Sequence, residues 1–479
     1  MERTEHSNDC VLTEPYAAIV LGAGISGLVS ASVLLDQGCK RVIVVDEYPH
    51  IGGNHIDWSK NGYTFDIGSI IFQDDSPLLK HFPELLEHYV PISPNWARLT
   101  PQGIVTAYPI SVKDDILAAG PLEILKILAS VVYARAFRRN MHNAKEFAQY
   151  WIGDRLLRRS GLDSYMTRFY GVSSDQIDIE LARKRMLWIS EHSSLRSVLA
   201  RIAKPNPPPP TNCQLARPRE GFAKLYSVAA AKLEERGADI VTGVKLRGLE
   251  KLGGDFRLVL DDRTILAKRV VSTIPISRVG ALCNLSPSEK LETITLLTLY
   301  FSFSGERGFT AAILYNFSHT GAWKRLTVYS DFYGRHDDRE YFAVEVISNH
   351  INGSVVDAEA DFRRHVAANG LFRGDLRLEG SQFLENAYPI YRGRADVKAA
   401  KAIEVLKSFG IESFGRQGGF NYQPTARVST LEAEAALQCP ADVKRLSVRD
   451  APLNVKRAAF TSRQAVEAPS IEEIETLLE

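Results

Sequence analysis

Cysteine is scarce in this sequence, and its cysteines are never closely spaced. The 479 residues contain five cysteines, which are scattered singly, and there is no C-x-x-C motif. An odd and dispersed set argues against a disulfide framework and is typical of reduced thiols in the cytosol. The polar stretch from Met1 to Glu14 also lacks the apolar core of a secretion signal. We therefore expect a cytoplasmic protein.

An excess of charge of one sign and a long apolar run are also missing. The 58 basic and 57 acidic residues nearly cancel, which argues against binding to a nucleic-acid backbone. No stretch reaches the 18 apolar residues that a membrane span needs. The nearest candidate, from Ile116 to Ala134, is interrupted by Pro121, Glu123 and Lys126 and is followed by three arginines. We predict an amphipathic helix of a cap domain here, and a helix on a membrane surface is the less favoured alternative.

The start of the sequence contains a complete β-turn-α-β unit. The apolar segment Tyr16–Leu21 predicts a strand, and the glycine-rich turn GAGISG follows at residues 22–27. Helical spacing then covers Leu28–Leu35, and a second strand is predicted over Arg41–Asp46. This order of elements is the context in which a G-x-G-x-x-G motif indicates a dinucleotide-binding site.

Each glycine of this motif has a mechanical role. Gly22 allows the tight turn, Gly24 lets the backbone approach a pyrophosphate, and Gly27 permits close packing of the helix on the strand. The pyrophosphate would then lie on free amides at the positive end of the helix. Asp46 ends the second strand, 24 residues after Gly22, where it can bind ribose hydroxyls. We therefore predict a dinucleotide site.

A second glycine pair favours FAD over NAD. Gly52, Gly53 and Asn54 come six residues after Asp46, and Phe65-Asp-Ile-Gly68 follows. The pair provides further close approach of the backbone, as a longer cofactor requires. No second G-x-G-x-x-G is present for a nicotinamide cofactor, and no His, Cys or Asp cluster has metal-ligand spacing. We expect FAD and no metal.

At this point the sequence resembles the FAD-dependent amine oxidase and protoporphyrinogen oxidase superfamily, and within it the branch that includes UDP-galactopyranose mutase. The first matching blocks are GAGISGL and VIVVDEYPHIGGN, with Asp46 in place of the usual Glu. In a third block, FDIGSIIF (65–72), Ser69 replaces a histidine. The remaining blocks are RFYG (168–171), PREGFAKL (218–225), VVSTIP (270–275), WKRL (323–326), AYPIY (387–391) and FGRQGGFNY (414–422).

The resemblance implies roles for individual residues. Arg416 corresponds to an arginine that contacts the FAD pyrophosphate, and Tyr422 to a tyrosine that contacts a substrate diphosphate. The implied cofactor contacts are Gly22, Gly24, Ile25, Ser26, Gly27, Asp46, Gly52, Gly53, Asn54, Val244 and Arg416. The implied substrate contacts are Arg168, Tyr170, Arg325 and Tyr422. The implied catalytic residues are Arg325, Tyr388 and Tyr422.

The fold that we expect is α/β, with a discontinuous Rossmann-type FAD-binding domain and an α+β substrate or cap domain. The FAD-binding domain would comprise residues 14–75, 214–290 and 383–440. The cap would comprise 76–213 and 291–382, with a linker at 204–210 and a C-terminal tail at 441–479. Periodicity predicts helices at 123–140, 144–160, 222–236 and 428–437, and strands at 240–252, 256–260, 269–274, 299–303, 324–329 and 341–347.

Three functions stay open at this point. The favoured one is an oxidoreductase in which a small-molecule substrate gives a hydride to flavin N5. The second is a mutase-like isomerase that uses reduced FAD on a nucleotide-linked sugar, whose anionic diphosphate the arginines and Tyr422 would hold. Ser69 and Tyr170 stand where that branch has histidine and tryptophan, which weakens this hypothesis. The third is a flavoprotein without catalysis.

Overall fold

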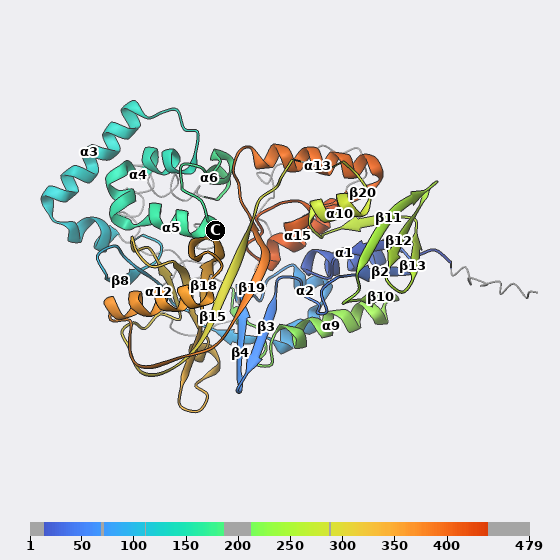
Figure 1. Ribbon diagram of the computed structural model, residues 1–479, viewed down its shortest axis with the longest axis horizontal. Coiled ribbons are helices and arrows are strands. Elements are labelled where there is room, and N and C mark those ends of the chain that lie inside the picture. The colour runs from blue at the N-terminus through green and yellow to red at the C-terminus, as the bar shows by residue number, and fades with distance from the viewer. Residues whose placement is uncertain (1–13, 69–70, 111, 186–211, 287–288, 439–479) are drawn as a thin grey trace, which may run out of the picture.

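The computed structural model describes residues 14–68, 71–110, 112–185, 212–286 and 289–438. Ser69, the predicted linker 204–210 and the predicted tail 441–479 lie outside these residues. The described chain forms two halves, each built around one large sheet, and two long strands run along the boundary between them (Figure 1). This architecture confirms the predicted α/β fold with a Rossmann-type domain.

The Rossmann-type half is built on a five-stranded parallel sheet with the order β10-β2-β1-β14-β20. Its central strands are short and fully buried, because a parallel sheet covered on both faces needs continuous apolar runs such as AIVL and VIVV. The strands are β1 (Ala18–Leu21), β2 (Val42–Val45), β10 (Ala238–Val241), β14 (Val270–Ser272) and β20 (Ile411–Ser413).

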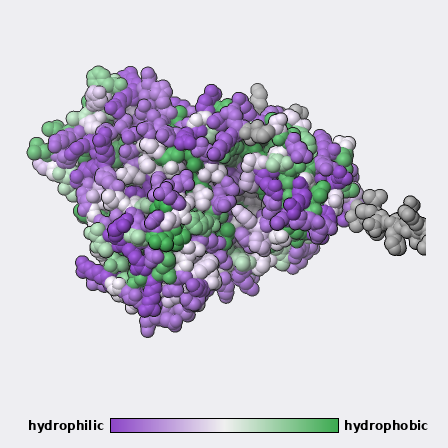
Figure 2. Space-filling view, viewed as in Figure 1, coloured by the Kyte–Doolittle hydropathy of each residue, from purple (hydrophilic) through white to green (hydrophobic). Residues whose placement is uncertain are grey.

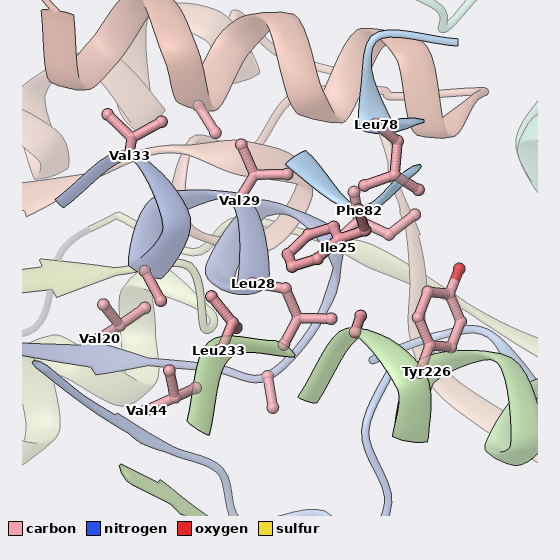
Figure 3. Packing of buried hydrophobic residues seen from close by; sticks show 14 of the residues in the cluster. Val20, Ile25, Leu28, Val29, Val33, Val44, Leu78, Phe82, Tyr226 and Leu233 are labelled. Carbon is pink, nitrogen blue, oxygen red and sulfur yellow. The ribbon is translucent and has the colours of Figure 1, made fainter. Parts of the chain in front are cut away.

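Helices cover one face of this sheet. Leu28 and Val29 of α1 (Ile25–Asp36) share a buried cluster with Leu233 of α9 (Phe222–Glu235) and with residues of α15 (Ala426–Gln438) (Figure 3). The opposite face packs on a small antiparallel sheet and on two further helices. These elements are β11 (Leu246–Leu252), β12 (Asp255–Leu260), β13 (Thr264–Ala267), α10 (Ile276–Leu282) and α13 (Ala395–Phe409).

The second half is built on a seven-stranded sheet with the order β19-β15-β18-β17-β16-β7-β8. A helical layer covers part of it, and Tyr165 and Phe169 of that layer pack with Tyr315 and Phe317 of the sheet and its following loop. The strands are β7 (Trp96–Leu99), β8 (Val105–Ala107), β15 (Thr293–Arg307), β16 (Ile313–Asn316), β17 (Trp323–Val328), β18 (Glu340–Ile347) and β19 (Phe372–Pro389). The helices of the layer are α3 (Pro121–Phe137), α4 (Ala144–Ser160), α5 (Leu162–Tyr170) and α6 (Ile179–Arg185), and α12 (Val355–Ala368) packs elsewhere on the sheet.

Several short elements pack on one of the two halves or between them. They are β3 (Ile56–Lys60), β4 (Tyr63–Ile67), β5 (Ile71–Gln73), β6 (Val90–Ile92), β9 (Gln214–Ala216), α2 (Leu78–His81), α11 (Ser330–Tyr333) and α14 (Gly415–Gly418). Asp66 at the end of β4 and Arg217 after β9 form a fully buried ion pair in this region.

Two predicted elements differ from the structure. The single strand predicted at 240–252 is wrong, because β10 ends at Val241 and β11 begins at Leu246 in a different sheet. Gly243 lies between them with φ +72°, a conformation that breaks an extended strand. The strand predicted at 299–303 is only the centre of β15, which is 15 residues long. The proposed domain boundary at 383 falls within the continuous strand β19, and the boundaries stay a prediction.

Candidate functional site

The glycine-rich turn between β1 and α1 forms the base of the site. Gly22 has φ +105°, and a Cβ there would lie 2.4 Å from Thr273 Oγ1. A Cβ at Gly27 would lie 1.8 Å from the carbonyl oxygen of Gly22. Gly24 is the N-cap residue of α1, and no side chain caps the helix there. The turn is thus compatible only with glycine at two positions, and it leaves the first amides of α1 available to an anion.

The second glycine pair lies directly against the first turn. An ideal Cβ at Gly53 would be 3.0 Å from the Cα of Gly24, and Gly52 has φ +110° with the Tyr226 ring behind it. The following residue, Asn54, has a buried side-chain nitrogen without a hydrogen-bond partner among the described residues. A buried amide without a partner is costly, so this group points to a ligand that accepts its hydrogen bond.

An acidic pair follows β2 at the same edge of the sheet. The carboxylate of Asp46 accepts hydrogen bonds from the backbone N–H of Ala23 at 2.6 Å and of Tyr48 at 2.8 Å. Burial raises the pKa of Asp46 above its ordinary value. Burial would also raise the pKa of Glu47, but Arg278 of α10, 2.6 Å away, outweighs it and lowers that pKa. Asp46 therefore holds the glycine turn in shape while it also faces the cavity.

These segments enclose a cavity of about 500 Å³ at the carboxyl ends of the parallel strands. This is where ligands bind in open α/β sheets. The predicted cofactor residues that line the cavity are Gly22, Gly24, Ile25, Ser26, Asp46, Gly52, Gly53, Asn54 and Arg416. Gly27 lies beneath the turn, and Val244 donates its backbone N–H to the carbonyl of Asp46; neither lines this cavity.

Several lining residues were missed by sequence reasoning. They include Glu47, Tyr48, Arg278, Asn386, Gln417, Gln423 and Ser429. Two of them had a detectable signal, because Glu47 directly follows Asp46 and Arg278 comes three residues after the VVSTIP block. Tyr48 lies two residues after Asp46, and the others come from β19 and from the segment after Arg416, which only the three-dimensional fold brings to the cavity.

Arg416 lies across the cavity from the start of α1. It belongs to the short helix α14, where an ideal Cβ at Gly415 would be 3.0 Å from Ser26 Oγ. Its guanidinium lies 5.7 Å from the centre of the Tyr388 ring and donates to the carbonyl of Gln423. A planar cation opposite a helix N-terminus is a suitable arrangement for binding a pyrophosphate from both sides.

The site continues into a second, inner cavity of only about 20 Å³, which is room for little more than one water molecule. Asn54, His55 and Arg416 line both cavities, so the two adjoin. Apolar and aromatic side chains form much of the wall of the inner cavity. Its further lining residues are Ile67, Gly68, Leu296, Arg325, Leu384, Ala387, Tyr388, Tyr422 and Pro424. The three predicted catalytic residues, Arg325, Tyr388 and Tyr422, thus lie around one space.

Arg325 is held in a buried ionic cluster on the large sheet. Its guanidinium donates to Glu345 of β18 at 2.5 Å and 3.0 Å, and Lys324 approaches the other oxygen of Glu345 at 2.9 Å. Burial would raise the pKa of Glu345, but Arg325 and Lys324 together hold it below its ordinary value. The cluster contains two positive charges and one negative charge, and both cations pair with the shared carboxylate.

Aromatic rings surround the ammonium group of Lys324. Its nitrogen lies 4.4 Å from the centre of the Phe169 ring and 4.6 Å from that of Tyr388. Tyr388 also packs against Tyr422, with 5.7 Å between ring centres. Because the faces of aromatic rings attract cations, these contacts fix the rings as well as the lysine. The inner cavity therefore has a rigid aromatic wall.

Arg168 and Tyr170 do not line either cavity. Arg168 donates to the backbone carbonyls of Asn316 at 2.7 Å, Ser318 at 3.0 Å and Thr320 at 3.3 Å. Burial lowers its pKa to about 10, so the guanidinium stays charged at neutral pH. Tyr170 is buried in the helical layer next to Phe169. The structure therefore does not bring these two predicted substrate contacts to the site.

His55 is a neutral side chain at the junction of the two cavities. It pairs through Nδ1 with the Tyr226 hydroxyl and stacks on Phe222 at 5.0 Å. Burial, and secondarily the charge of Arg416, lower its pKa to about 3. The unfolded chain then binds an extra proton between about pH 3 and the ordinary pKa of 6.5, so this group should cost stability as the pH falls below 6.5.

We expect His55→Gln to remove this dependence. As the pH drops below 6.5, the wild type should lose up to about 1.4 kcal/mol of unfolding free energy per pH unit relative to the variant. Denaturant titrations from pH 4 to 8 measure it, and the exposed His142→Gln serves as the control. A difference that is constant over this range would contradict the neutral assignment of His55.

Arg416→Ala should weaken binding of the cofactor. Loss of a charged hydrogen bond to a phosphate costs about 1.5–3 kcal/mol, or roughly 10- to 150-fold in Kd. Titration of the apoprotein with FAD measures this change. Arg364→Ala, at a side chain that is 77% exposed on α12, should leave the Kd unchanged. Equal affinities of the two variants would contradict the role of Arg416.

Comparison with known proteins agrees with this geometry. Residues 20–84 match the family described as NAD(P)-binding Rossmann-like domain. The fold is similar to that of reduced UDP-galactopyranose mutase, with a TM-score of 0.70, 17% identity, and coverage of 89% of this chain and 93% of that one. It is also similar to a protein provisionally assigned as a protoporphyrinogen oxidase from Exiguobacterium sp. 255-15, with a TM-score of 0.68, 15% identity, and coverage of 89% and 98%.

Similarity in sequence is confined to the first part of the chain. Prolycopene isomerase 2, chloroplastic, from an Oncidium hybrid cultivar is 45% identical over 58 residues, which are 12% of this chain and 10% of that protein. The match thus spans about a tenth of this relative. At these identities the two solved structures show a shared fold, and the family match covers the start of the Rossmann-type half. The glycine cradle, the free helix amides and the unpartnered Asn54 nitrogen all fit FAD.

Proposed function

We propose that this protein is an FAD-dependent oxidoreductase that acts on a small molecule bound where the larger cavity meets the inner one. The adjoining of the two cavities carries the proposal. Asn54, His55 and Arg416 line both, so a cofactor bound at the glycine turn would adjoin the space lined by Tyr388 and Tyr422. The likeness in fold to a superfamily of flavoenzymes supports the same conclusion.

The lining of the inner cavity supports a neutral and largely apolar substrate. Ile67, Leu296, Leu384 and Pro424 contribute apolar surface. Two arginines line this cavity: Arg325 is engaged with a buried carboxylate, and Arg416 also lines the larger cavity, where we expect it to bind the cofactor. We therefore favour an unsaturated, uncharged substrate over the anionic, nucleotide-linked substrate that the sequence also allowed.

Bound FAD would supply the redox chemistry, in which the substrate loses a hydride to flavin N5 and oxygen or another acceptor takes the electrons afterwards. The chain would contribute binding and orientation. The amides of α1 and Arg416 would hold the pyrophosphate. The side-chain N–H of Asn54, which has no partner among the described residues, would donate a hydrogen bond to the cofactor. Tyr388 and Tyr422 would orient the substrate, and the buried Lys324 and Arg325 would make the potential around it positive.

A mutase-like isomerase is the second candidate. The TM-score of 0.70 to UDP-galactopyranose mutase favours it, and so does the position of Tyr422 at the inner cavity. It requires cationic side chains that are free to hold a substrate diphosphate. Arg168 is bound to three backbone carbonyls instead, and Arg325 is bound to Glu345. We therefore rank this candidate below the oxidoreductase.

One pair of experiments separates the two candidates. The flavin-loaded protein is mixed anaerobically with amines and with apolar polyunsaturated compounds, and bleaching of the oxidised flavin spectrum is followed. The oxidoreductase proposal predicts bleaching by at least one compound class and recovery of the spectrum on admission of air. In parallel, dithionite-reduced protein is incubated with UDP-galactose. Formation of the furanose sugar without bleaching by any test compound would favour the mutase and contradict our proposal.

A further inference from the structure

The helix α3 presents an apolar surface to solvent. Its buried side consists of Ile127 and Ala134, which are seven residues apart and therefore lie on one side of the helix. Large apolar side chains occupy the opposite side, and their exposed fractions reach 76% at Leu122 and 75% at Phe137. We define the apolar face of α3 as Leu122, Leu125, Leu128, Val132, Tyr133 and Phe137.

This concentration is unusual within the described part of the chain. Six of the fifteen exposed large apolar side chains belong to this one helix, whereas Val356, Val405 and Leu431 are single exposed residues on three other helices. Figure 2 shows apolar atoms at the outer edge of the molecule, where Figure 1 places α3. Single exposed apolar residues need no explanation, but a contiguous face marks an interaction surface.

The helix is firmly attached to the protein by its other side. Glu123 forms an ion pair with Arg155 of α4, and the Arg135 guanidinium lies 5.4 Å from the centre of the Trp151 ring. Gly153 has no room for a side chain because the backbone nitrogen of Val131 would lie 2.9 Å from its Cβ. The exposed face is therefore part of a rigid helical pair.

Basic residues surround the apolar face. Residues 121–160 contain eight Lys and Arg against three Asp and Glu, whereas the whole chain is balanced at 58 and 57. Lys126 is 63% exposed and lies within the face, and Arg138 and Arg139 are exposed just beyond the end of the helix. An exposed apolar stripe with arginine and lysine at its border is the arrangement of helices that lie in the interface of an anionic bilayer.

The charge also argues for a lipid occupant over a second copy of the chain. Two copies that docked through this face would bring their basic borders together, and like charges at an interface are unfavourable. Among the described residues, no helix is both long and apolar enough to cross a bilayer. We propose that the apolar face of α3 docks this protein onto the surface of membranes that contain anionic phospholipids.

The test measures binding of the flavin-loaded full chain to vesicles by flotation. Vesicles of phosphatidylcholine alone are compared with vesicles of phosphatidylcholine and phosphatidylglycerol. We expect the protein to float with the anionic vesicles and to remain largely unbound with the neutral ones. The variant Leu125→Glu/Val132→Glu should lower the bound fraction at least roughly tenfold, because it places two charges in the inserted face. Arg138→Gln/Arg139→Gln should weaken binding at low salt, as added salt does to the wild type.

A matched control and two readouts keep the result unambiguous. Val405→Glu changes a residue that is 51% exposed on α13, far from α3 in the sequence, and should float like the wild type. All variants should keep the flavin spectrum and the thermal midpoint. The proposal is overturned if the wild type does not float, if it binds neutral vesicles equally well, or if the double glutamate variant binds like the control. It is also overturned if the chain is a dimer that this variant dissociates while vesicles bind neither form.

Discussion

Gly27→Ala should yield a protein that retains little or no flavin. The added methyl group would lie 1.8 Å from the carbonyl oxygen of Gly22. Because this oxygen belongs to the backbone, it cannot move away as the end of a flexible side chain could. The turn must therefore shift, which displaces the amides at the start of α1 that we expect to hold the pyrophosphate. We also expect a loss of about 1–3 kcal/mol in the free energy of unfolding, as for other overpacked sites.

Gly280→Ala is the matched control for this substitution. Gly280 lies in the helix α10 beside the same cavity, and nothing lies within 4 Å of an ideal Cβ there. The control should keep its flavin and be equally or slightly more stable, because alanine is the better helix residue. The measurements are the flavin-to-protein ratio after purification and a denaturant titration. If Gly27→Ala kept a full complement of flavin, the glycine turn would not be the cofactor cradle.

Among the substitutions proposed here, Glu345→Ala should cause the largest loss in the free energy of unfolding. It would leave Lys324 and Arg325 buried without their carboxylate, with side chains that are 2% and 9% exposed. Removal of one partner from a buried ion pair costs about 3–5 kcal/mol, because the remaining charge is uncompensated. Denaturant unfolding measures this loss, and the change should also disturb the rings of Phe169 and Tyr388 that enclose Lys324.

An exposed ion pair supplies the comparison for Glu345. Glu250 pairs with Arg257 between β11 and β12, where both side chains are more than 40% exposed. Glu250→Ala should change the unfolding free energy by at most about 1 kcal/mol, as is usual for surface pairs. Similar losses for the two variants would show that the cluster around Glu345 is not a buried charge network.

The cofactor end of the site could be predicted from sequence because its residues are close together along the chain. Gly22, Gly24 and Asp46 act through turn geometry and strand ends, which local sequence determines. The structure places all three at one cavity. The parallel strands β1 and β2 were also readable, since a strand that is buried on both faces needs an uninterrupted apolar run.

The substrate end could not be predicted in the same way. The sequence alone does not distinguish the roles of Arg168 and Arg325, because each is an arginine within a block that resembles the superfamily. Their surroundings depend on distant segments, namely the carbonyls of residues 316–320 for Arg168 and the carboxylate of Glu345 for Arg325. The break between β10 and β11 was missed for a related reason, because the two strands pair with different sheets and only the tertiary fold separates them.

The visible spectrum of the purified protein, followed by release of its ligand on denaturation, tests the central proposal most directly. We predict a yellow protein that releases FAD on unfolding in a ratio near one per chain, or takes up FAD to that ratio when purified without it. A colourless protein that releases no flavin and binds none on incubation would contradict the assignment of the cavity at the start of α1.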